Sequence, residues 1–140
     1  MALLHFRRAV AEDCAALLTI RQAAIRGLAG PLMNQDEAER WAMRLSPDGM
    51  AERMARLEIW VAERHGTVIG WIGFEGAWIE NLYRDPEPAS RGTGSVLLSH
   101  AEQLIRDRGH ASVGLKSAAS AVGFYRRHGY VPVAPPEPDG

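Results

Sequence analysis

The chain has 140 residues, of which 46% are hydrophobic and 24% charged, with a formal net charge of −1. This length suits one domain, and the near-neutral charge argues against a protein that binds nucleic acid by neutralising phosphates. A single cysteine, five scattered histidines and no apolar run near the roughly 20 residues of a membrane helix predict a cytoplasmic protein without a disulfide, metal site or membrane partner.

The first part of the chain predicts one strand followed by three helices. The strand is expected over residues 3–10, and the helices over residues 11–30, 34–45 and 47–57. Apolar residues near the 3.6-residue period of a helix support the first helix, and Asn34 is a typical N-cap for the second.

The middle of the chain predicts three antiparallel strands. They are expected over residues 58–64, 67–74 and 77–84, which are rich in Val, Ile, Trp and Tyr. Each junction is a short turn that ends in glycine, as is typical of a tight hairpin.

The remaining segments predict helix, strand, helix and strand over residues 92–108, 111–117, 120–129 and 130–133. A strand, a helix and a second strand form a right-handed crossover, so strands 77–84 and 111–117 should be parallel. We therefore expect an α+β domain over residues 1–134, with a mixed sheet flanked by helices, and a disordered proline-rich tail over 135–140.

The segment Arg91-Gly92-Thr93-Gly94-Ser95 lies between a predicted strand and a predicted helix. N–H groups in the first turn of a helix have no partner within the helix and lie at its positive end. Gly92 and Gly94 would let a diphosphate approach these donors closely, although a tight turn without a ligand is the alternative. A dinucleotide-binding loop is disfavoured, because Leu97 stands where the third glycine of G-x-G-x-x-G belongs.

Two motifs resemble those of the GNAT acetyltransferase superfamily. Residues 82–86 with 91–95 and the following helix look like its acetyl-CoA-binding motif, Q/R-x-x-G-x-G/A. Residues 120–130, "SAVGFYRRHGY", resemble its second signature, an Ala-x-x-Phe-Tyr helix that ends in Gly-Phe or Gly-Tyr. Ala89 departs from the Gln or Arg of the first motif, and Arg84 stands where an aliphatic residue is usual.

The resemblance implies a GNAT-type fold and acetyl-CoA as cosubstrate. Strand 77–84 would splay from its parallel neighbour, the pantetheine arm would pair with the exposed edge, and the Leu82 N–H would polarise the acetyl carbonyl. The residues implied in cofactor binding are Leu82, Tyr83, Arg84, Ser90, Arg91, Gly92, Thr93, Gly94, Ser95 and Ser120.

Two side chains are candidates for proton transfer. Tyr125 matches the family's general acid and could protonate the departing thiolate, or it is a core aromatic beside Phe124. Glu80 lies two residues before Leu82, so the period of two in a strand places both on one face, where Glu80 could accept the proton of the amine directly or through water. A solvated surface charge is the alternative for Glu80.

The amine site itself is less readable. Trp41 and Trp78 are candidates for its wall, although Trp41 also suits a helix core. Whether the acceptor is an amino acid, a polyamine, a drug, a peptide N-terminus or a lysine stays open.

We predict an N-acetyltransferase in which the amine of a small molecule or peptide attacks acetyl-CoA directly in a ternary complex. No histidine is placed to activate Cys14 or a serine as a nucleophile. An acyl-CoA-binding regulatory module on the same fold, with little or no catalysis, is the alternative. Strand 111–117 should have an open outer edge, which either residues 130–133 cover or a second chain completes in a homodimer.

Overall fold

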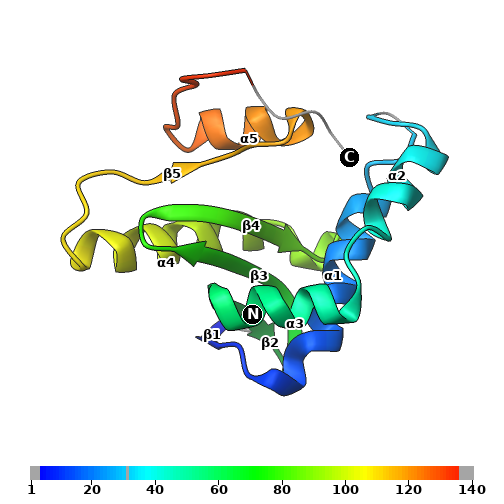
Figure 1. Ribbon diagram of the computed structural model, residues 1–140, viewed down its shortest axis with the longest axis horizontal. Helices are drawn as coiled ribbons and strands as arrows, with labels where there is room; N and C mark the ends of the chain where they lie inside the picture. Colours follow the sequence, from blue (N-terminus) through cyan, green and yellow to red (C-terminus); the bar gives the residue numbers. More distant parts are fainter. Residues whose placement is uncertain (1–3, 31, 136–140) are drawn as a thin grey trace.

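The computed structural model describes residues 4–30 and 32–135. One mixed sheet runs through the molecule in the order β1-β2-β3-β4-β5 (Figure 1). The first four strands pair antiparallel and the last pair is parallel, which confirms the predicted α+β class. The strands are β1 (His5–Arg8), β2 (Glu58–Arg64), β3 (Thr67–Glu75), β4 (Trp78–Arg84) and β5 (Gly114–Leu115).

Helices cover both faces of this sheet. The α-helices are α1 (Cys14–Arg26), α2 (Gln35–Ala42), α3 (Pro47–Arg56), α4 (Thr93–Asp107) and α5 (Val122–Arg127). Short 3-10 turns precede three of them, at Ala11–Asp13, Pro88–Ser90 and Ala119–Ala121. Within the described ranges, no helix is both long and apolar enough to cross a bilayer.

The core has two parts, one on each face of the sheet. On one face Leu97 of α4 packs with Ile72 of β3. On the other, Leu17 of α1 and Met50 of α3 pack with Trp71 of β3. The alternation of β3 side chains between the two faces explains this division, and each buried side chain of this size contributes about 1.5–3 kcal/mol.

A β-bulge interrupts the regular pairing of β3 with β4. Gly73 lies opposite Asn81 while the next residue, Phe74, lies opposite Ile79, so Glu80 is the extra residue. The expectation that Glu80 and Leu82 share a face is therefore wrong. Leu82 packs on the α4 side with Ile79, whereas Glu80 points to α3, because one inserted residue reverses the alternation.

The parallel pair is much shorter than the sequence predicts. Strand β5 has two residues instead of seven, and only Trp78 and Ile79 of β4 lie opposite them. Beyond this point the chain leaves the sheet and leads into α5, whose residues Phe124 and Tyr125 pack against the core (Figure 1). Strand β4 therefore has an open edge from Glu80 onward within the described part of the chain.

The predicted strand over residues 130–133 is not formed, and these residues do not cover β5. Val131 and Val133 are 78% and 97% exposed. Completion of the β5 edge by a second chain stays a prediction. The expected disorder of the tail concerns mainly residues 136–140, which lie outside the described residues.

The start of α1 is fixed to β1 by a two-pronged ion pair. Arg7 donates to both carboxylate oxygens of Asp13, at 2.8 and 2.9 Å, and the Val10 N–H donates to Oδ2 at 2.7 Å. The Arg7 guanidinium lowers the pKa of the Asp13 carboxyl, and the Val10 N–H acts in the same direction against the opposing effect of burial. This pair therefore stabilises the fold at neutral pH.

We expect Asp13→Asn to lower the free energy of unfolding at pH 7 by about 1.5–3 kcal/mol, because it removes a charge-assisted pair. Since the folded pKa is depressed, the contribution is present above the unfolded value of about 3.9 and is lost as pH falls through the folded value. Urea unfolding at several pH values should show that the free energies of unfolding of the parent protein and of Asp13→Asn become equal in acid. Glu52→Gln, on the exposed side of α3, is the control. A difference in unfolding free energy between the parent and Asp13→Asn that does not change with pH would contradict the role given to the Arg7–Asp13 pair.

Candidate active site

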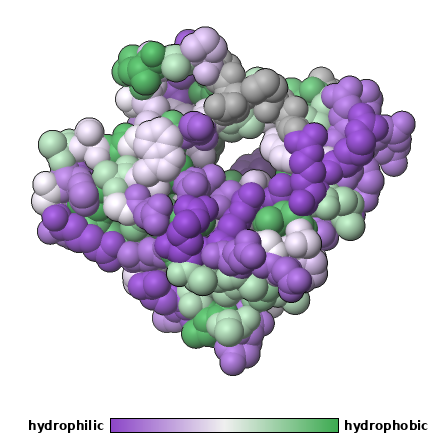
Figure 2. Space-filling view, viewed as in Figure 1, coloured by the Kyte–Doolittle hydropathy of each residue, from purple (hydrophilic) through white to green (hydrophobic). Residues whose placement is uncertain are grey.

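A cavity of about 540 Å³ opens between β4, α1, α2 and the segment that leads into α5. Figure 2 shows the surface hollowed near the middle of this face. Eight of the residues singled out in the sequence line this cavity, although they come from distant parts of the chain. They are Trp41, Glu80, Leu82, Tyr83, Arg84, Gly94, Ser120 and Tyr125.

The remaining predicted residues lie around or outside this cavity. Ser90 and Thr93 are buried at the start of α4, and Arg91 and Gly92 are exposed at the same turn. Ser95 is half-buried one residue beyond Gly94. None of these five residues lines the cavity, although each lies within four residues of Gly94, which does.

The open edge of β4 offers unpaired backbone groups to the cavity. The Asp85 N–H donates to the Ile69 carbonyl oxygen at 2.8 Å, which fixes the hydrogen-bonded positions of the β3–β4 pair. Hydrogen-bonded and non-hydrogen-bonded positions alternate along an antiparallel pair. Tyr83 therefore bonds to β3, and the N–H and C=O groups of Leu82 and Arg84 point to the opposite edge, where β5 has already ended.

The first turn of α4 offers a second set of donors. Gly92 precedes the helix with φ of 87°, a left-handed conformation that favours glycine, and an added Cβ would meet no atom within 4 Å. In the described ranges, no acceptor is found for the N–H groups of residues 92–95. The Thr93 hydroxyl beside them is also buried without a partner. This cradle of donors suits a diphosphate group.

A hydrogen bond ties the end of α5 to this turn. His128 Nδ1 lies 2.8 Å from the Phe124 carbonyl oxygen, so in a neutral ring Nδ1 donates and Nε2 accepts from the Ser95 hydroxyl at 2.9 Å. A Cβ at Gly94 would lie 3.6 Å from the Phe124 ring, so the absence of a side chain also allows α5 to approach α4. His128 has no local signal in the sequence, and we did not predict its role.

Tyr125 lies between two aromatic rings and lines the cavity. Its ring makes edge contacts with Phe124 and Tyr130, at centroid distances of 5.2 and 5.7 Å. No hydrogen-bond partner of its hydroxyl is found among the described residues. Burial raises the pKa of Tyr125 to about 12, with a smaller contribution from Tyr83, so the hydroxyl keeps its proton at neutral pH.

The bulge in β4 brings two polar side chains to the same side. Glu80 forms an ion pair with Arg56 of α3, which also lies 3.5 Å from Glu75. Asn81 is only 8% exposed, and its buried Oδ1 atom has no hydrogen-bond partner in the part of the chain described. Sequence patterns predicted neither Arg56 nor Asn81 as part of the site. The ion pair of Arg56 with Glu80 and the burial of Asn81 both depend on the bulge.

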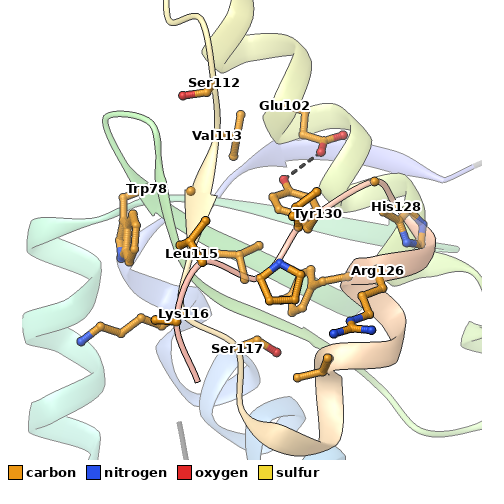
Figure 3. A pocket seen from close by; sticks show the side chains of 18 of the residues that line it. Trp78, Glu102, Ser112, Val113, Leu115, Lys116, Ser117, Arg126, His128 and Tyr130 are labelled. Atoms are coloured by element: carbon orange, nitrogen blue, oxygen red, sulfur yellow. Dashed lines mark hydrogen bonds between the residues drawn. The ribbon is translucent and has the colours of Figure 1, made fainter. Parts of the chain in front are cut away.

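A second cavity, of about 610 Å³, lies between β5 and residues 129–135 (Figure 3). Trp78 lines this cavity and not the first one, with its ring over Gly114, where an added Cβ would lie 2.8 Å from the ring. Tyr130 donates to Glu102 at 2.8 Å on the far wall. The two cavities share Lys116 and Tyr125.

Metal chemistry has no obvious ligand set in residues 4–30 and 32–135. These ranges contain no group of three or more His, Cys, Asp or Glu side chains that could hold an ion.

Comparisons with known proteins agree with this geometry. A family model described as an acetyltransferase (GNAT) domain matches residues 30–139. The Escherichia coli K12 protein YafP, described as an uncharacterized N-acetyltransferase, is 29% identical over 90 residues, which are 64% of this chain and 56% of that protein. The chain thus spans about half the length of this curated relative.

Solved structures share the fold. A GCN5-related N-acetyltransferase from Rhodopseudomonas palustris has a TM-score of 0.77 at 24% identity, over 94% of this chain and 83% of that one. A GNAT family acetyltransferase from Brucella melitensis, solved with acetyl-CoA, has a TM-score of 0.63 at 25% identity, over 99% and 93%. The PaiA N-acetyltransferase from Thermoplasma acidophilum, solved with coenzyme A, has a TM-score of 0.71 at 19% identity, over 90% and 88%.

The raised pKa of Tyr125 can be measured directly. Because the pKa of Tyr125 lies at about 12, this residue stays protonated over most of the range in which ordinary tyrosines titrate. We therefore expect folded Tyr125→Phe to show the same tyrosinate absorbance as the folded parent protein between about pH 9 and pH 11. In unfolding urea, where every tyrosine titrates near its ordinary value of about 10, the variant should lose the absorbance of one residue. A loss of absorbance below about pH 11 in the folded variant would show instead that Tyr125 is solvated.

Proposed function

The chain belongs to the GNAT acetyltransferase family, and on this premise we propose that it transfers an acetyl group from acetyl-CoA to a primary amine. The observation that carries the proposal is the convergence of three features on one cavity: the open edge of β4, the first turn of α4 at Gly94, and Tyr125. The N-acetyltransferase names of the relatives and the acetyl-CoA bound by the Brucella protein support it.

The first turn of α4 binds the diphosphate of the cosubstrate. The N–H groups of residues 92–95 donate to its oxygens, and each bond to a charged group contributes about 1.5–3 kcal/mol. Arg91 directly precedes the turn and Arg84 lines the same cavity as Gly94, so both add positive charge there. Ala89, in place of the usual Gln or Arg, removes one side-chain contact, so backbone donors carry most of the binding.

The open edge of β4 holds the pantetheine arm and the thioester. The N–H and C=O groups of Leu82 and Arg84 pair with the amides of the arm as a further strand would, and Ser120 borders the same cavity. The Leu82 N–H donates to the acetyl oxygen as negative charge develops there, which lowers the barrier to attack.

The protons move through two side chains on opposite sides of the reacting carbon. Glu80 accepts a proton from the amine, directly or through water, after its carboxylate moves away from Arg56. The amine nitrogen bonds to the acetyl carbon, and the bond from that carbon to sulfur breaks. Tyr125 then gives its proton to the departing thiolate and regains one from solvent, while Glu80 releases to solvent the proton that it took from the amine.

The other partners are also proposed. The acceptor is a small molecule or a peptide, with Trp41 in the wall of its site, and neither nucleic acid nor membrane takes part. The proposed setting is the cytoplasm, where acetyl-CoA is available. A homodimer that completes the β5 edge is compatible with this site, which lies on the other side of β5.

One observation favours a second candidate, an acyl-CoA-binding regulatory module. The ion pair with Arg56 occupies the proposed base, Glu80, whereas the donors for coenzyme A stay available. Such a module would bind coenzyme A without turnover.

Turnover of Tyr125→Phe separates the two candidates. The change keeps the ring and removes only the acidic proton, so we expect kcat to fall by roughly 10²-fold while folding survives. Free thiol released from acetyl-CoA is the readout. Tyr130→Phe, which removes a neighbouring hydroxyl bonded to Glu102, should stay within a few-fold of the parent. Unchanged kcat in Tyr125→Phe would return Tyr125 to a packing role, and no turnover in the parent would favour the regulatory module.

The diphosphate site has a separate test. Gly94→Asp places a carboxylate in the first turn of α4, so repulsion and crowding against Phe124 should weaken coenzyme A binding by more than about 10-fold. Calorimetry on variants shown to be folded measures this directly. Ala111→Asp introduces the same charge at an exposed position beyond the other end of α4 and should bind normally. Equal affinities for the two variants would move the diphosphate elsewhere.

A further inference from the structure

Arg53 in α3 is a half-buried cation with no partner of its own. Within the described ranges its guanidinium makes no hydrogen bond or ion pair, although it lies within electrostatic reach of Tyr83 and Glu80. Desolvation lowers the pKa of Arg53, and nearby Arg21 and Arg56 act in the same direction. A guanidinium group has five donors, and leaving them unpaired in a partly dry place is costly.

Arg21 in α1 lies beside Arg53 and has no carboxylate partner either. It is 4% exposed and donates to the backbone carbonyl oxygens of Ala42 and Trp41, at 3.0 and 3.4 Å. Its Nε is buried and has no hydrogen-bond partner among the described residues. The guanidinium also lies 6.0 Å from the ring centre of Tyr83. Arg21 therefore fixes the end of α2 and adds a permanent positive charge behind Tyr83.

The charges in this cluster do not balance. Arg56 uses Glu75 and Glu80, and these two carboxylates face three guanidinium groups. Of these five side chains, Glu80 also lines the cavity, beside Tyr83. A band of hydrophilic residues lies below the hollow in Figure 2. The α3 side of Glu80 thus carries a net positive charge, next to the point where this carboxylate lines the cavity.

We propose that the acceptor amine carries an anionic group, a carboxylate or a phosphate, and that Arg53 binds this group while the amine lies at Glu80. The inference rests on the proposed acetyl transfer and adds the chemical class of the acceptor. The bound anion supplies the missing partner of Arg53 and neutralises the cluster. Release of Arg56 from Glu80 toward the same anion would free the base. The net positive charge of the cluster disfavours a polyamine.

Binding without turnover tests the anion site. The probes are leucine against leucinamide and phosphoethanolamine against ethanolamine, measured by calorimetry with and without coenzyme A. We expect the anionic member of one pair to bind the parent protein about 10-fold more tightly than its neutral partner. The pair that shows the difference identifies the bound group: a carboxylate for leucine, or a phosphate for phosphoethanolamine. Arg53→Gln should abolish the difference, and Arg53→Lys should keep part of it.

A matched control removes an exposed guanidinium instead. Arg44 follows α2 and is exposed, and in the described part of the chain its side chain is found in no contact with the cluster, so Arg44→Gln should leave all four affinities unchanged. Urea unfolding of each variant shows whether an effect comes from lost stability. Equal affinities within both pairs, no binding of either anionic probe, or a difference that survives Arg53→Gln would each overturn the inference.

Turnover with the same four amines separates this inference from the function on which it rests. Thiol release that is about 10-fold faster with the anionic member, and lost in Arg53→Gln, supports both. Thiol release that is equally fast with neutral and anionic amines upholds acetyl transfer and overturns the anion site. Selective binding of an anionic probe without thiol release from any amine overturns acetyl transfer and keeps the anion site.

Discussion

The site depends on a parallel strand pair that ends after two residues. Trp78 and Ile79 lie opposite Gly114 and Leu115, and beyond them β4 and β5 separate. If the pairing continued, the N–H and C=O groups of Leu82 and Arg84 would be used within the sheet, and the cavity would be closed. Backbone groups at an open edge need partners from elsewhere, which is why this edge can hold an extended ligand.

Because of the bulge at Glu80, strand β4 contributes side chains both to the core and to the charged cluster beside α3. Leu82 stays on the α4 side with the core, and its backbone faces the open edge. Glu80 and Asn81 turn together toward the side of α1 and α3, where the arginines lie. A regular strand would have placed only one of these two polar residues there. A single inserted residue therefore joins the edge of the sheet to the charged cluster.

Features with a local cause could be predicted from the sequence. Glycine-ended turns identified the three antiparallel strands, and Gly92 with Gly94 identified the start of α4. The bulge could not be predicted, because the residues from Ile79 to Leu82 also fit plain alternation. The ion pair of Arg56 with Glu80 joins residues far apart in the sequence, so only the tertiary packing determines it. The early end of β5 likewise depends on where α5 packs.

The last segment of the chain is held to the rest by few contacts. None of the residues of α5 is buried, and the segment is attached by the β4–β5 pair, by the His128–Ser95 and Tyr130–Glu102 hydrogen bonds, and by packing of Phe124, Tyr125 and Tyr130 against the core. Segments of this kind undergo local opening at a lower free energy than global unfolding. A molecule in the cavity between β4 and α5 would contact both sides, so its binding energy adds to the free energy of that opening. Occupancy of the cavity and order of the C-terminal segment are therefore thermodynamically linked.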